Sequence, residues 1–441
     1  MSTKFRIFSL LLGDLFLMAV SLGITLLIRY GKNGFLALFP THVKPFSLIF
    51  IIWLLIFYII GLYEPRGFKN NLNFAKNFGI GLLINIVVAT IFFYLIPGFG
   101  ITPKTNLLIF VVIFGILDWL WRWVFNNLTV SPAALAKILI IGAGSDFEKT
   151  IDYLSRSPQL GFEIKAWLKT ADEEDNRKIS RMIKEGGIDS IILASHLKQN
   201  EPLVKTIYQN LASGIEVVDF NIFYQNTFKK VSLEEIKESW ILENVAKKQR
   251  AYEIFKSFFE HLLAALLTII FLPIFAIVFL LIKISSPGPA LYKQIRVGKN
   301  EKQFNLYKFR TMKIDAEKNG PQWSQPNDPR RTKIGKILRF THLDELPQLI
   351  NILKGDLSFV GPRPERPEFV RELKEKIPYY EIRHLIKPGF TGWAQTNYPY
   401  GASLKDAYEK LQYDIYYIKN RSPILDLLII VKTAKLFFGK I

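Results

Sequence analysis

Four long apolar stretches fill the first 125 residues of the chain. They are Ile7–Ile28, Phe46–Leu62, Phe78–Ile96 and Leu107–Phe125. Each is close to the ~20 residues that a helix needs to cross a bilayer. The first stretch is too long for a removable signal peptide and lacks the cleavage pattern of one. The pattern therefore predicts four transmembrane helices within residues 1–130.

From Lys137 onward, short β-rich runs alternate with polar helical stretches. The predicted strands are Lys137–Ile141, Ile164–Leu168, Ser190–Leu193 and Ile215–Val218. The predicted helices between them are Phe147–Leu154, Asn176–Glu185 and Pro202–Leu211. This alternation is typical of a parallel sheet covered by helices. We expect a Rossmann-like α/β domain within residues 131–247.

The turn after the first predicted strand reads Gly142-Ala143-Gly144 and could cradle a phosphate. The dinucleotide fingerprint, however, needs a third small residue where this chain has Phe147. The second strand, which ends at Leu168, is followed by Lys169 instead of an acid. We therefore predict a scaffold domain without a tightly bound dinucleotide.

A fifth apolar stretch, Leu262–Ile282, is also long enough to span a membrane. Pro273 lies at its centre, where proline removes a backbone hydrogen bond and kinks a helix. Basic residues flank the stretch on both sides, whereas a crossing helix should show asymmetry. We expect a re-entrant segment, helix-break-helix, that enters and leaves one face of the membrane. A plain fifth span is the alternative.

The charge of the chain fits a membrane better than a nucleic acid. Its 441 residues are 50% hydrophobic and carry a net charge of +19. Such a surplus suits nucleic acid, or an anionic membrane surface together with a phosphorylated substrate. The apolar stretches favour the second reading, so we expect no nucleic-acid partner. No cysteine is present, which excludes disulfides and thiolate metal sites.

The distribution of basic residues predicts the orientation of the spans. Lys4 and Arg6 precede the first stretch, and Arg66, Lys69 and Lys76 follow the second. The positive-inside rule then places the N-terminus in the cytoplasm. Four crossings return the chain to the cytoplasm before residue 131.

Two acids lie inside the predicted spans, where a charge is costly. We expect Asp14 and Asp118 to face protein and to pair with Arg122. An ion pathway would need more such groups.

Three basic clusters follow the fifth stretch. They are Lys308–Met312, Arg339–Pro347 and Gly361–Pro364, and the second contains the acid pair Asp344-Glu345. Thr341 could cap a helix with Asp344 as a mere capping partner, but Pro347 would then fall in the helix interior. A helix that starts near Asp344 puts the proline in its first turn and the two acids at the positive end of the helix dipole.

Two adjacent acids repel each other unless a cation is close. Arg339, Lys308 or Mg²⁺ could supply that charge, and carboxylate pairs often bind Mg²⁺ beside substrate phosphates. Arg363 lies between two prolines, and its planar guanidinium suits phosphate oxygens. The clusters therefore predict a phosphate-binding site.

From about Arg250 to Ile441 the chain closely resembles the bacterial sugar transferases, which are polyprenyl-phosphate glycosyl-1-phosphate transferases with a re-entrant helix. The resemblance is carried by SPGPALYKQIRVG, FNLYKFRTM, LDELPQLINILKGDLSFVGPRP and KPGFTGWAQ. The four spans and the α/β domain resemble the large members that initiate exopolysaccharide, capsule or O-antigen synthesis. The resemblance implies an α-rich catalytic domain within residues 248–441, with the re-entrant helix at about 262–282.

The resemblance also implies roles for individual residues. Asp344 would be the nucleophile, and Glu345 would take part in catalysis as a Mg²⁺ ligand. Five basic residues would bind substrate: Lys308, Arg310, Arg339, Arg363 and Arg366. The chain departs from the family in having Leu272-Pro273 where Ser-Pro is frequent. It also has His342 where a small residue is usual, and we interpret this histidine as a packing or capping residue.

The implied reaction is a double displacement. Asp344 would attack the sugar-bearing phosphorus of a UDP-sugar and release UMP, and undecaprenyl phosphate would then take the sugar phosphate. This places the enzyme in the bacterial inner membrane, with its catalytic domain on the cytoplasmic face. We further expect a homodimer.

Two other functions are compatible with parts of the pattern. A membrane-anchored nucleotide-sugar epimerase or dehydratase would need the intact dinucleotide fingerprint and a Tyr-x-x-x-Lys pair. A non-catalytic polysaccharide-export regulator would leave the C-terminal acids as surface features. The tail Ile424–Phe438 could be an interfacial or a core helix. Trp393, Gln395, Asn397 and Tyr398 could line a sugar pocket or serve in packing.

Overall fold

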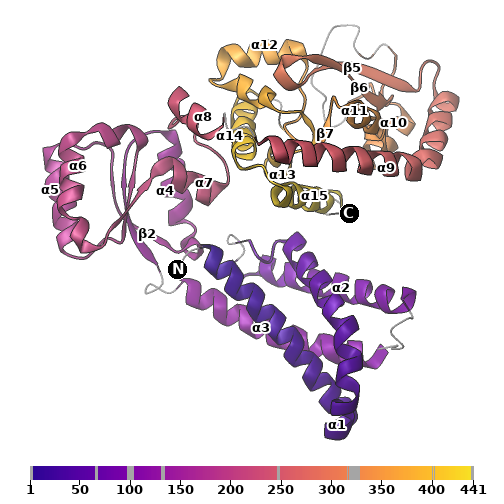
Figure 1. The fold of residues 1–441 in the computed structure, drawn as a ribbon, viewed down its shortest axis with the longest axis horizontal. Coiled ribbons are helices and arrows are strands. Elements are labelled where there is room, and N and C mark those ends of the chain that lie inside the picture. The colour runs from indigo at the N-terminus through magenta and orange to yellow at the C-terminus, as the bar shows by residue number, and fades with distance from the viewer. Residues whose placement is uncertain are drawn as a thin grey trace. The chain divides into compact units, whose positions relative to one another are not determined.

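The computed structural model describes residues 3–64, 68–96, 104–130, 135–245, 249–314, 316, 328–399, 401 and 403–438. The chain divides into two compact units, Met1–Phe223 and Tyr224–Ile441. The first unit contains long helices and a parallel sheet, and the second contains the helices and short sheets that follow (Figure 1). The predicted limits of the three domains, 1–130, 131–247 and 248–441, stay predictions.

The first unit begins with three long helices within its described residues: α1 (Thr3–Ile60), α2 (Leu72–Leu95) and α3 (Lys104–Val130). The first two predicted spans both lie in α1, which Gly31 interrupts with a φ of 64°. Glycine adopts this left-handed conformation without a steric cost. The loop expected between those spans is wrong, because residues 32–45 are helical. The apolar pattern predicts which residues lie in lipid, but it does not predict where a helix ends.

The predicted pairing of the acids within the spans is confirmed. Arg122 of α3 forms ion pairs with Asp14 of α1 and with Asp118, at 2.9 Å for Asp118. Tyr63 donates a hydrogen bond of 2.5 Å to Asp14. All three charged side chains are buried, so the charges compensate one another inside the helix bundle.

Polar contacts cluster at the two ends of this bundle. At one end Arg6 donates to the carbonyl of Gln159 in the α/β domain, at 3.1 Å, and Asn70 donates to the carbonyl of Trp123. At the other end Asn106 bonds to Arg29 and His42. The N-terminus and the link after α1 therefore lie at the same end, as alternating crossings require. Which end is cytoplasmic stays a prediction.

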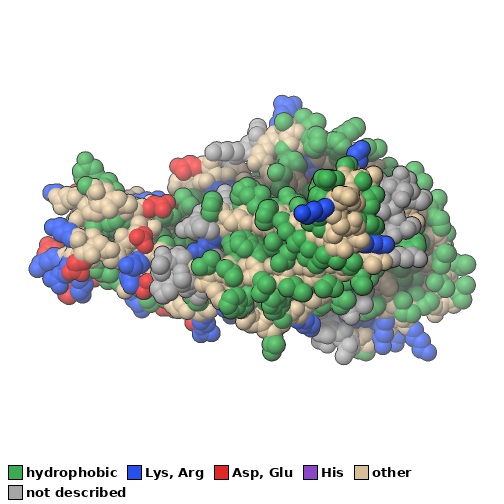
Figure 2. All heavy atoms as spheres, turned by 90° about the horizontal axis from the view of Figure 1, so that it is seen from below, with side chains coloured by type: hydrophobic (Ala, Val, Ile, Leu, Met, Phe, Trp, Pro, Cys, Tyr) green, Lys and Arg blue, Asp and Glu red, His purple; other side chains and the backbone are tan. Residues whose placement is uncertain are grey.

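Among the residues that the structure describes, four helices have the length and apolar composition needed to cross a membrane. They are Phe5–Ile60, Leu72–Leu95, Thr105–Leu128 and Arg250–Ser285. Figure 2 shows many exposed hydrophobic side chains along the helices, while charged side chains of both signs gather at the end formed by the α/β domain. A broad apolar surface of this kind indicates contact with lipid, and the chain is therefore a membrane protein.

The α/β domain has a four-stranded parallel sheet in the order β2-β1-β3-β4. Its strands are β1 (Ala136–Ile141), β2 (Phe162–Leu168), β3 (Ser190–Leu193) and β4 (Glu216–Asp219). Its helices are α4 (Ser145–Ser155), α5 (Glu173–Lys184), α6 (Glu201–Gln209) and α7 (Phe220–Phe228), whose end belongs to the second unit. Every predicted strand and helix of this domain is confirmed within a few residues. The fully buried Leu139, Ile141 and Ile191 form its core.

Aromatic rings fill the space beside the glycine turn of this domain. The ring of Phe147 stacks on Phe220 with 3.6 Å between centroids, and a Cβ added to Gly142 would lie 2.6 Å from it. Trp167 donates a hydrogen bond of 2.8 Å to the carbonyl of Gly142. This packing supports the interpretation as a scaffold, although the lack of a tightly bound dinucleotide stays a prediction.

The second unit surrounds its core with helices and two short sheets. Its helices are α8 (Glu238–Asn244), α9 (Arg250–Ser285), α10 (Lys333–Phe340), α11 (Gln348–Lys354), α12 (Pro367–Lys376), α13 (Trp393–Asn397), α14 (Leu404–Asn420) and α15 (Pro423–Phe438). An antiparallel pair consists of β5 (Leu291–Val297) and β6 (Gln303–Phe309). A parallel pair consists of β7 (Ser358–Val360) and β8 (Gly389–Thr391).

The fifth apolar stretch lies in α9, which is one continuous helix through Pro273. The predicted helix-break-helix is therefore wrong as regards the break. The axis nevertheless changes direction in the second half of α9 (Figure 1), as expected of a helix with an internal proline. Both parts share buried clusters with residues of β6, since Ala264 belongs to one cluster with Leu306 and Val278 to another with Phe309. Whether α9 re-enters or crosses the membrane stays a prediction.

The C-terminal helix α15 has features of both alternatives for the tail, a core helix and an interfacial helix. Ile429 is buried, and the hydroxyls of Thr433 and Thr391 lie 2.7 Å apart, so one face packs on the unit. Ile424 and Leu427 are exposed on the other face. The helix is both a core element and an apolar surface.

Candidate active site

The candidate site lies where β6, a 3₁₀ turn and the segment after β7 meet. Lys308 is the penultimate residue of β6, and Asp344 and Glu345 belong to the turn Leu343–Glu345. Arg363 follows β7 in the Gly361-Pro362-Arg363-Pro364 segment. The structure thus brings together members of all three basic clusters.

The acid pair precedes a helix, but it does not begin one as expected. Thr341 ends α10, and its hydroxyl donates back to the carbonyl of Ile337, so it caps no following helix. From Glu345 to Ile350 the backbone forms i to i−3 bonds, such as Leu346 N to Leu343 O and Ile350 N to Pro347 O. Pro347 has no N–H for an α-helical bond, and α11 starts only at Gln348. The acids therefore lie in a 3₁₀ turn ahead of α11, and the expected helix-dipole argument does not apply.

His342 opens this turn in a left-handed conformation, with a φ of 56°. Residues other than glycine rarely adopt this region, although histidine is among those enriched there. The conformation makes the chain reverse between α10 and the acids. This local role agrees with the interpretation of His342 as a packing or capping residue.

Glu345 is held by two cations. Its Oε1 accepts a hydrogen bond of 2.6 Å from Lys308 Nζ and one of 3.4 Å from Arg363. Burial by itself would raise the pKa of Glu345, but Lys308 and Arg363 outweigh it and lower the pKa to about 2. Burial also lowers the pKa of Lys308, against the opposing effect of Glu345. Glu345 is therefore an ionised and firmly placed carboxylate.

Asp344 has the opposite environment. Its side chain is buried, with 7% of the residue exposed. Burial raises the pKa of its carboxyl to about 6, and Glu345 adds to this, while Lys308 and Arg339 act in the other direction. Two neighbouring acids whose pKa values are driven apart are typical of sites where two carboxyl groups have different tasks.

Of the remaining predicted substrate-binding residues, only Arg339 is shown to act on Asp344, and all three contact other parts of the unit. Arg339 donates from Nε to the hydroxyl of Thr311, at 2.9 Å. Arg310 donates to the carbonyls of Pro287 and Ser286, at 2.7 and 3.0 Å, and so fixes the turn after α9. Arg366 precedes α12 and contacts Glu368 at 3.7 Å. Substrate binding by these three residues stays a prediction.

The residues of the acid pair suit a magnesium ion bound together with a phosphorylated substrate. Within the described residues no cluster of three or more His, Cys, Asp or Glu could hold a metal. Magnesium, however, commonly takes one or two carboxylates and completes its shell with waters and substrate phosphates. Both cations contact Oε1 of Glu345, and the carboxyl of Asp344 is adjacent. The donor set therefore fits Mg²⁺, with Glu345 as its proposed ligand.

The residues suggested for a sugar pocket are largely engaged in packing. Trp393 is buried and donates to the carbonyl of Lys229, at 2.8 Å. Asn397 donates to the carbonyl of Trp393, and Tyr398 donates to Asp406. Of the two alternatives, these contacts favour packing.

Sequence reasoning missed two buried ion pairs near the Arg363 segment. Lys256 lies 2.9 Å from Asp426, and Arg383 lies 3.1 Å from Asp414. The partners are far apart in the chain, so no local pattern could have linked them. Burial raises the pKa of Asp414 to about 6, against the effect of Arg383.

Comparisons with known proteins identify a family that the chain resembles. The family model for bacterial sugar transferases matches residues 251–440. A UDP-N-acetylgalactosamine-undecaprenyl-phosphate N-acetylgalactosaminephosphotransferase of Aeromonas hydrophila is 46% identical over 40% of this chain and 41% of its own length. A UDP-glucose:undecaprenyl-phosphate glucose-1-phosphate transferase of Xanthomonas campestris pv. campestris is 28% identical over 73% of this chain and 70% of its own length. The exopolysaccharide production protein PSS of Rhizobium leguminosarum bv. phaseoli is 42% identical over 42% of this chain and 92% of its own length.

The pKa values of the two neighbouring acids are shifted in opposite directions, and cations suited to phosphate lie beside them. Such a site is typical of enzymes that transfer phosphoryl groups, and here it occurs in a chain with membrane helices. Together with the similarities, this places the protein plainly: the chain belongs to the bacterial sugar transferase family. The matched region spans less than half the length of the Aeromonas hydrophila relative.

Proposed function

We propose that this protein transfers a sugar-1-phosphate from a UDP-sugar to undecaprenyl phosphate, as the first membrane step of a polysaccharide pathway. The names of the relatives support this reaction class, since two of them act on a UDP-sugar and undecaprenyl phosphate. The sugars in those two names differ, so the proposal does not extend to a particular sugar. The epimerase or dehydratase alternative is not favoured, because the family match covers the region of the acid pair.

The observation that carries the mechanism is the contrast between the two acids. Glu345 is occupied by Lys308 and Arg363, whereas Asp344 is buried with a pKa raised to about 6. At neutral pH Asp344 is mostly ionised, and its burial deprives the carboxylate of the water that would stabilise it. A carboxylate in this state is suited to nucleophilic attack.

The proposed reaction has two displacements. In the first, a carboxylate oxygen of Asp344 forms a bond to the sugar-bearing phosphorus, and the bond from that phosphorus to the oxygen of UMP breaks. In the second, a phosphate oxygen of the acceptor attacks the same phosphorus and releases the Asp344 carboxylate. Lys308 and Arg363 are placed to stabilise the charge on the phosphate oxygens and on UMP. A bound Mg²⁺ would supply further neutralisation of the donor diphosphate.

The location of the reaction is part of the same proposal. UDP-sugars are cytoplasmic, so the catalytic unit would face the cytoplasm at the bacterial inner membrane, with α9 as a re-entrant helix. The homodimer expected from the sequence also remains a proposal. No nucleic-acid partner is proposed.

The decisive experiment traces the β-phosphate of the UDP-sugar to the protein and then to the acceptor. Purified protein is incubated with UDP-glucose or UDP-N-acetylgalactosamine carrying a radioactive β-phosphate, without acceptor. Wild type and an Asp356→Asn control should become labelled with one of these donors, and Asp344→Asn should not. Addition of undecaprenyl phosphate should discharge the label. The mechanism fails if Asp344→Asn turns over at the wild-type rate.

A further inference from the structure

The backbone segment that carries Arg363 is held by its carbonyl oxygens. Val360 O accepts hydrogen bonds from Lys256 Nζ at 2.8 Å, from Ser358 Oγ at 3.0 Å and from Tyr417 at 3.2 Å. Arg383 donates to the carbonyl of Arg363 at 2.8 Å. Pro362 and Pro364 have no N–H, so this segment offers few donors and must be anchored mainly through acceptors.

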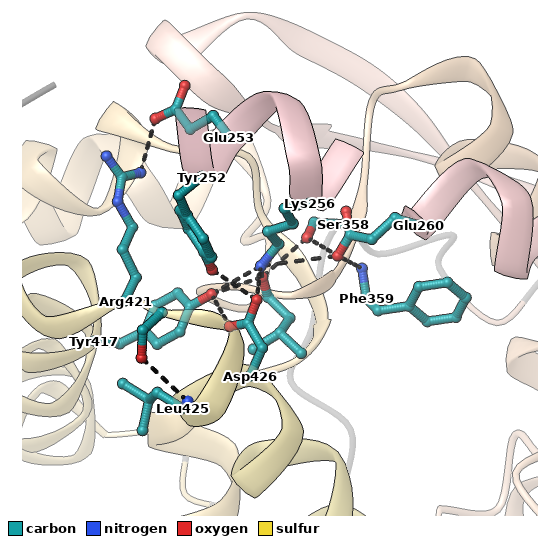
Figure 3. Close-up of polar contacts among 12 residues, drawn as sticks. Tyr252, Glu253, Lys256, Glu260, Ser358, Phe359, Tyr417, Arg421, Leu425 and Asp426 are labelled. Atoms are coloured by element: carbon teal, nitrogen blue, oxygen red, sulfur yellow. Dashed lines mark hydrogen bonds and ion pairs between the residues drawn. The ribbon is translucent and has the colours of Figure 1, made fainter. Parts of the chain in front are cut away.

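Lys256 reaches Val360 from the first turns of the membrane helix α9. Figure 3 shows its ammonium among the carboxylate of Asp426, the hydroxyl of Tyr417 and the backbone of β7. The distances to Asp426 and to Tyr417 are both 2.9 Å. Glu260, one turn further along α9, lies 3.8 Å away.

Asp426 of α15 fixes this ammonium and is itself fixed. Its Oδ2 accepts a hydrogen bond of 2.6 Å from Tyr252, and its Oδ1 accepts one of 2.7 Å from Tyr417 (Figure 3). Burial raises the pKa of Tyr417 well above its ordinary value, so its hydroxyl remains a donor at physiological pH. The network thus joins four elements: α9 and β7 with α14, which carries Tyr417, and α15.

A small cavity of about 70 Å³ adjoins this network and is lined by Lys256, Tyr252 and Val360 among others. Two of the cations at its wall are engaged by acids of the chain, since Lys256 contacts Asp426 and Arg421 contacts Glu253 at 3.0 Å.

We propose that Lys256 is a positioning residue for the transfer reaction, acting through the carbonyl of Val360 on the placement of Arg363. Asp426 and Tyr417 hold the Lys256 ammonium in place. Because Lys256 belongs to α9, the correct seating of this membrane helix is linked to the geometry of a phosphate-binding arginine. The inference rests on the proposed function, since it takes the role of Arg363 from there.

The first test compares two matched ion pairs in the full-length protein. Lys256→Met removes the ammonium but keeps most of the side-chain volume. Lys230→Met is the control, because Lys230 forms an ion pair of 2.6 Å with Glu409 that is as buried as the Lys256–Asp426 pair but does not contact the Arg363 segment. The side chains are 10% and 12% exposed in the control pair, against 14% and 13% in the proposed one.

Lys256→Met should lower kcat/KM for the UDP-sugar by roughly 10- to 100-fold, because small displacements of a group that orients substrate have effects of this size. Lys230→Met should change kcat/KM by less than about threefold at an equal loss of thermal stability. Equal effects of the two substitutions would overturn the proposal.

The second test asks whether Lys256 acts through Arg363. In an Arg363→Ala background, Lys256→Met should cause less than about a twofold further loss, because the group that it positions is gone. A purely structural Lys256 would lower the rate by the same factor in both backgrounds, and that result would overturn the proposal. Wild-type activity of Arg363→Ala would overturn it as well.

A milder variant decides the matter if Lys256→Met does not accumulate as folded protein. Tyr417→Phe keeps the buried ring and removes only the hydroxyl that bonds Val360 and Asp426. Its smaller loss of kcat/KM should likewise vanish in the Arg363→Ala background, and a loss that persists there contradicts the inference. Failure of the proposed function is distinguishable, since it appears as labelling or turnover of Asp344→Asn.

Discussion

Asp344 and Glu345 are neighbours in the chain with opposite electrostatic surroundings. Glu345 points to Lys308 and Arg363, and its pKa is lowered to about 2. Asp344 is buried, no ion pair of its carboxyl occurs within the described part of the chain, and its pKa is raised to about 6. The two adjacent carboxyl groups thus titrate in different pH ranges, and this difference can be tested by the pH dependence of the reaction rate.

The raised pKa of Asp344 predicts an acid limb in the pH profile. A carboxyl with a pKa of about 6 is ionised above that pH and protonated below it, so the nucleophile is lost as the pH falls through about 6. The rate of UMP release, measured from pH 5 to 8, should fall about tenfold per unit on the acid side.

The same profile should depend on magnesium. A cation beside Asp344 favours its ionised form, so the midpoint should move to lower pH as Mg²⁺ is raised from limiting to saturating concentrations. A midpoint that is independent of Mg²⁺ would argue against a metal next to this acid pair.

Substitution of Lys308 should affect both stability and activity. Lys308→Met leaves the buried Glu345 with only the longer contact to Arg363, and removing one partner of a buried pair typically costs about 3–5 kcal/mol. We expect a lower thermal midpoint and a loss of UMP release of about 100-fold or more. Lys293→Met, an exposed lysine on the neighbouring strand β5, is the control and should do neither.

The double variant Lys308→Met/Glu345→Gln separates the two effects. Removal of both charges should restore most of the thermal midpoint, because position 345 no longer carries an uncompensated buried charge. Activity should stay low. Recovery of activity in this variant would contradict the catalytic role of the pair.

The sequence suggested the residues of this site but not their partners. Arg339, Lys308 and Mg²⁺ were equivalent candidates for the charge beside the acids, because spacing along the chain cannot rank them. The tertiary contact between β6 and the turn Leu343–Glu345 brings Lys308 to Glu345, while Arg339 turns to Thr311. A close approach of Gly335 to the backbone of Thr311 contributes to this arrangement, since an added Cβ would collide with the Thr311 carbonyl.

Among the secondary-structure elements, α9 differs most from its sequence pattern. Length and apolar character predicted a membrane segment, and α9 has both. The sequence could not tell whether Pro273 breaks the helix or only bends it. That outcome depends on how the two parts pack on β6, which periodicity does not encode.

The membrane topology of α9 can be tested because the chain has no cysteine. Exposed residues on its two sides, Glu243 and Lys293, are replaced singly by cysteine, and Lys32 near the turn at Gly31 is replaced as a reference. A re-entrant α9 predicts that positions 243 and 293 react with an impermeant thiol reagent from the same side of membrane vesicles. Position 32 should react from the opposite side. Reaction of 243 and 293 from opposite sides would show a crossing helix.

The small parallel sheet illustrates what the sequence predicts well. Its strands alternate with helices at short intervals, and most strand residues are apolar, so the local pattern and the final structure agree. The sequence pattern did not predict a contact between the first turn of α1 and the α/β domain. The buried contact of Arg6 with Gln159 arises only when residues 153 positions apart meet.

At the scale of the whole molecule, two compact units divide the chain between Phe223 and Tyr224. The Rhizobium leguminosarum bv. phaseoli relative matches this chain over 92% of its own length with only 42% of this chain. A shorter protein of this family therefore lacks most of what precedes the matched region. We expect residues 224–441, purified in detergent, to retain UMP release within about tenfold of the full chain.

A shorter fragment that starts at residue 251 should be much less stable. Val231, Leu233 and Ile236 are buried in the core of the second unit, and Val231 N donates to the carbonyl of Gln412 at 3.0 Å. Loss of three buried aliphatic side chains costs about 5 kcal/mol or more. Circular dichroism on heating should show a clearly lower midpoint than that of the 224–441 fragment. Equal midpoints would mean that residues 224–250 contribute little to this core.

The anchoring of the Arg363 segment has a consequence for the portability of sequence motifs. Gly-Pro-Arg-Pro reads as a self-contained signature, but Gly389 and Arg383 donate to its carbonyls at Pro362 and Arg363. Donors from α9 and α14 hold the carbonyl of Val360 immediately before it. Grafting these four residues onto another scaffold would transfer their sequence without their conformation. A design that reuses this arginine must therefore also include the elements that anchor its backbone, α9 among them.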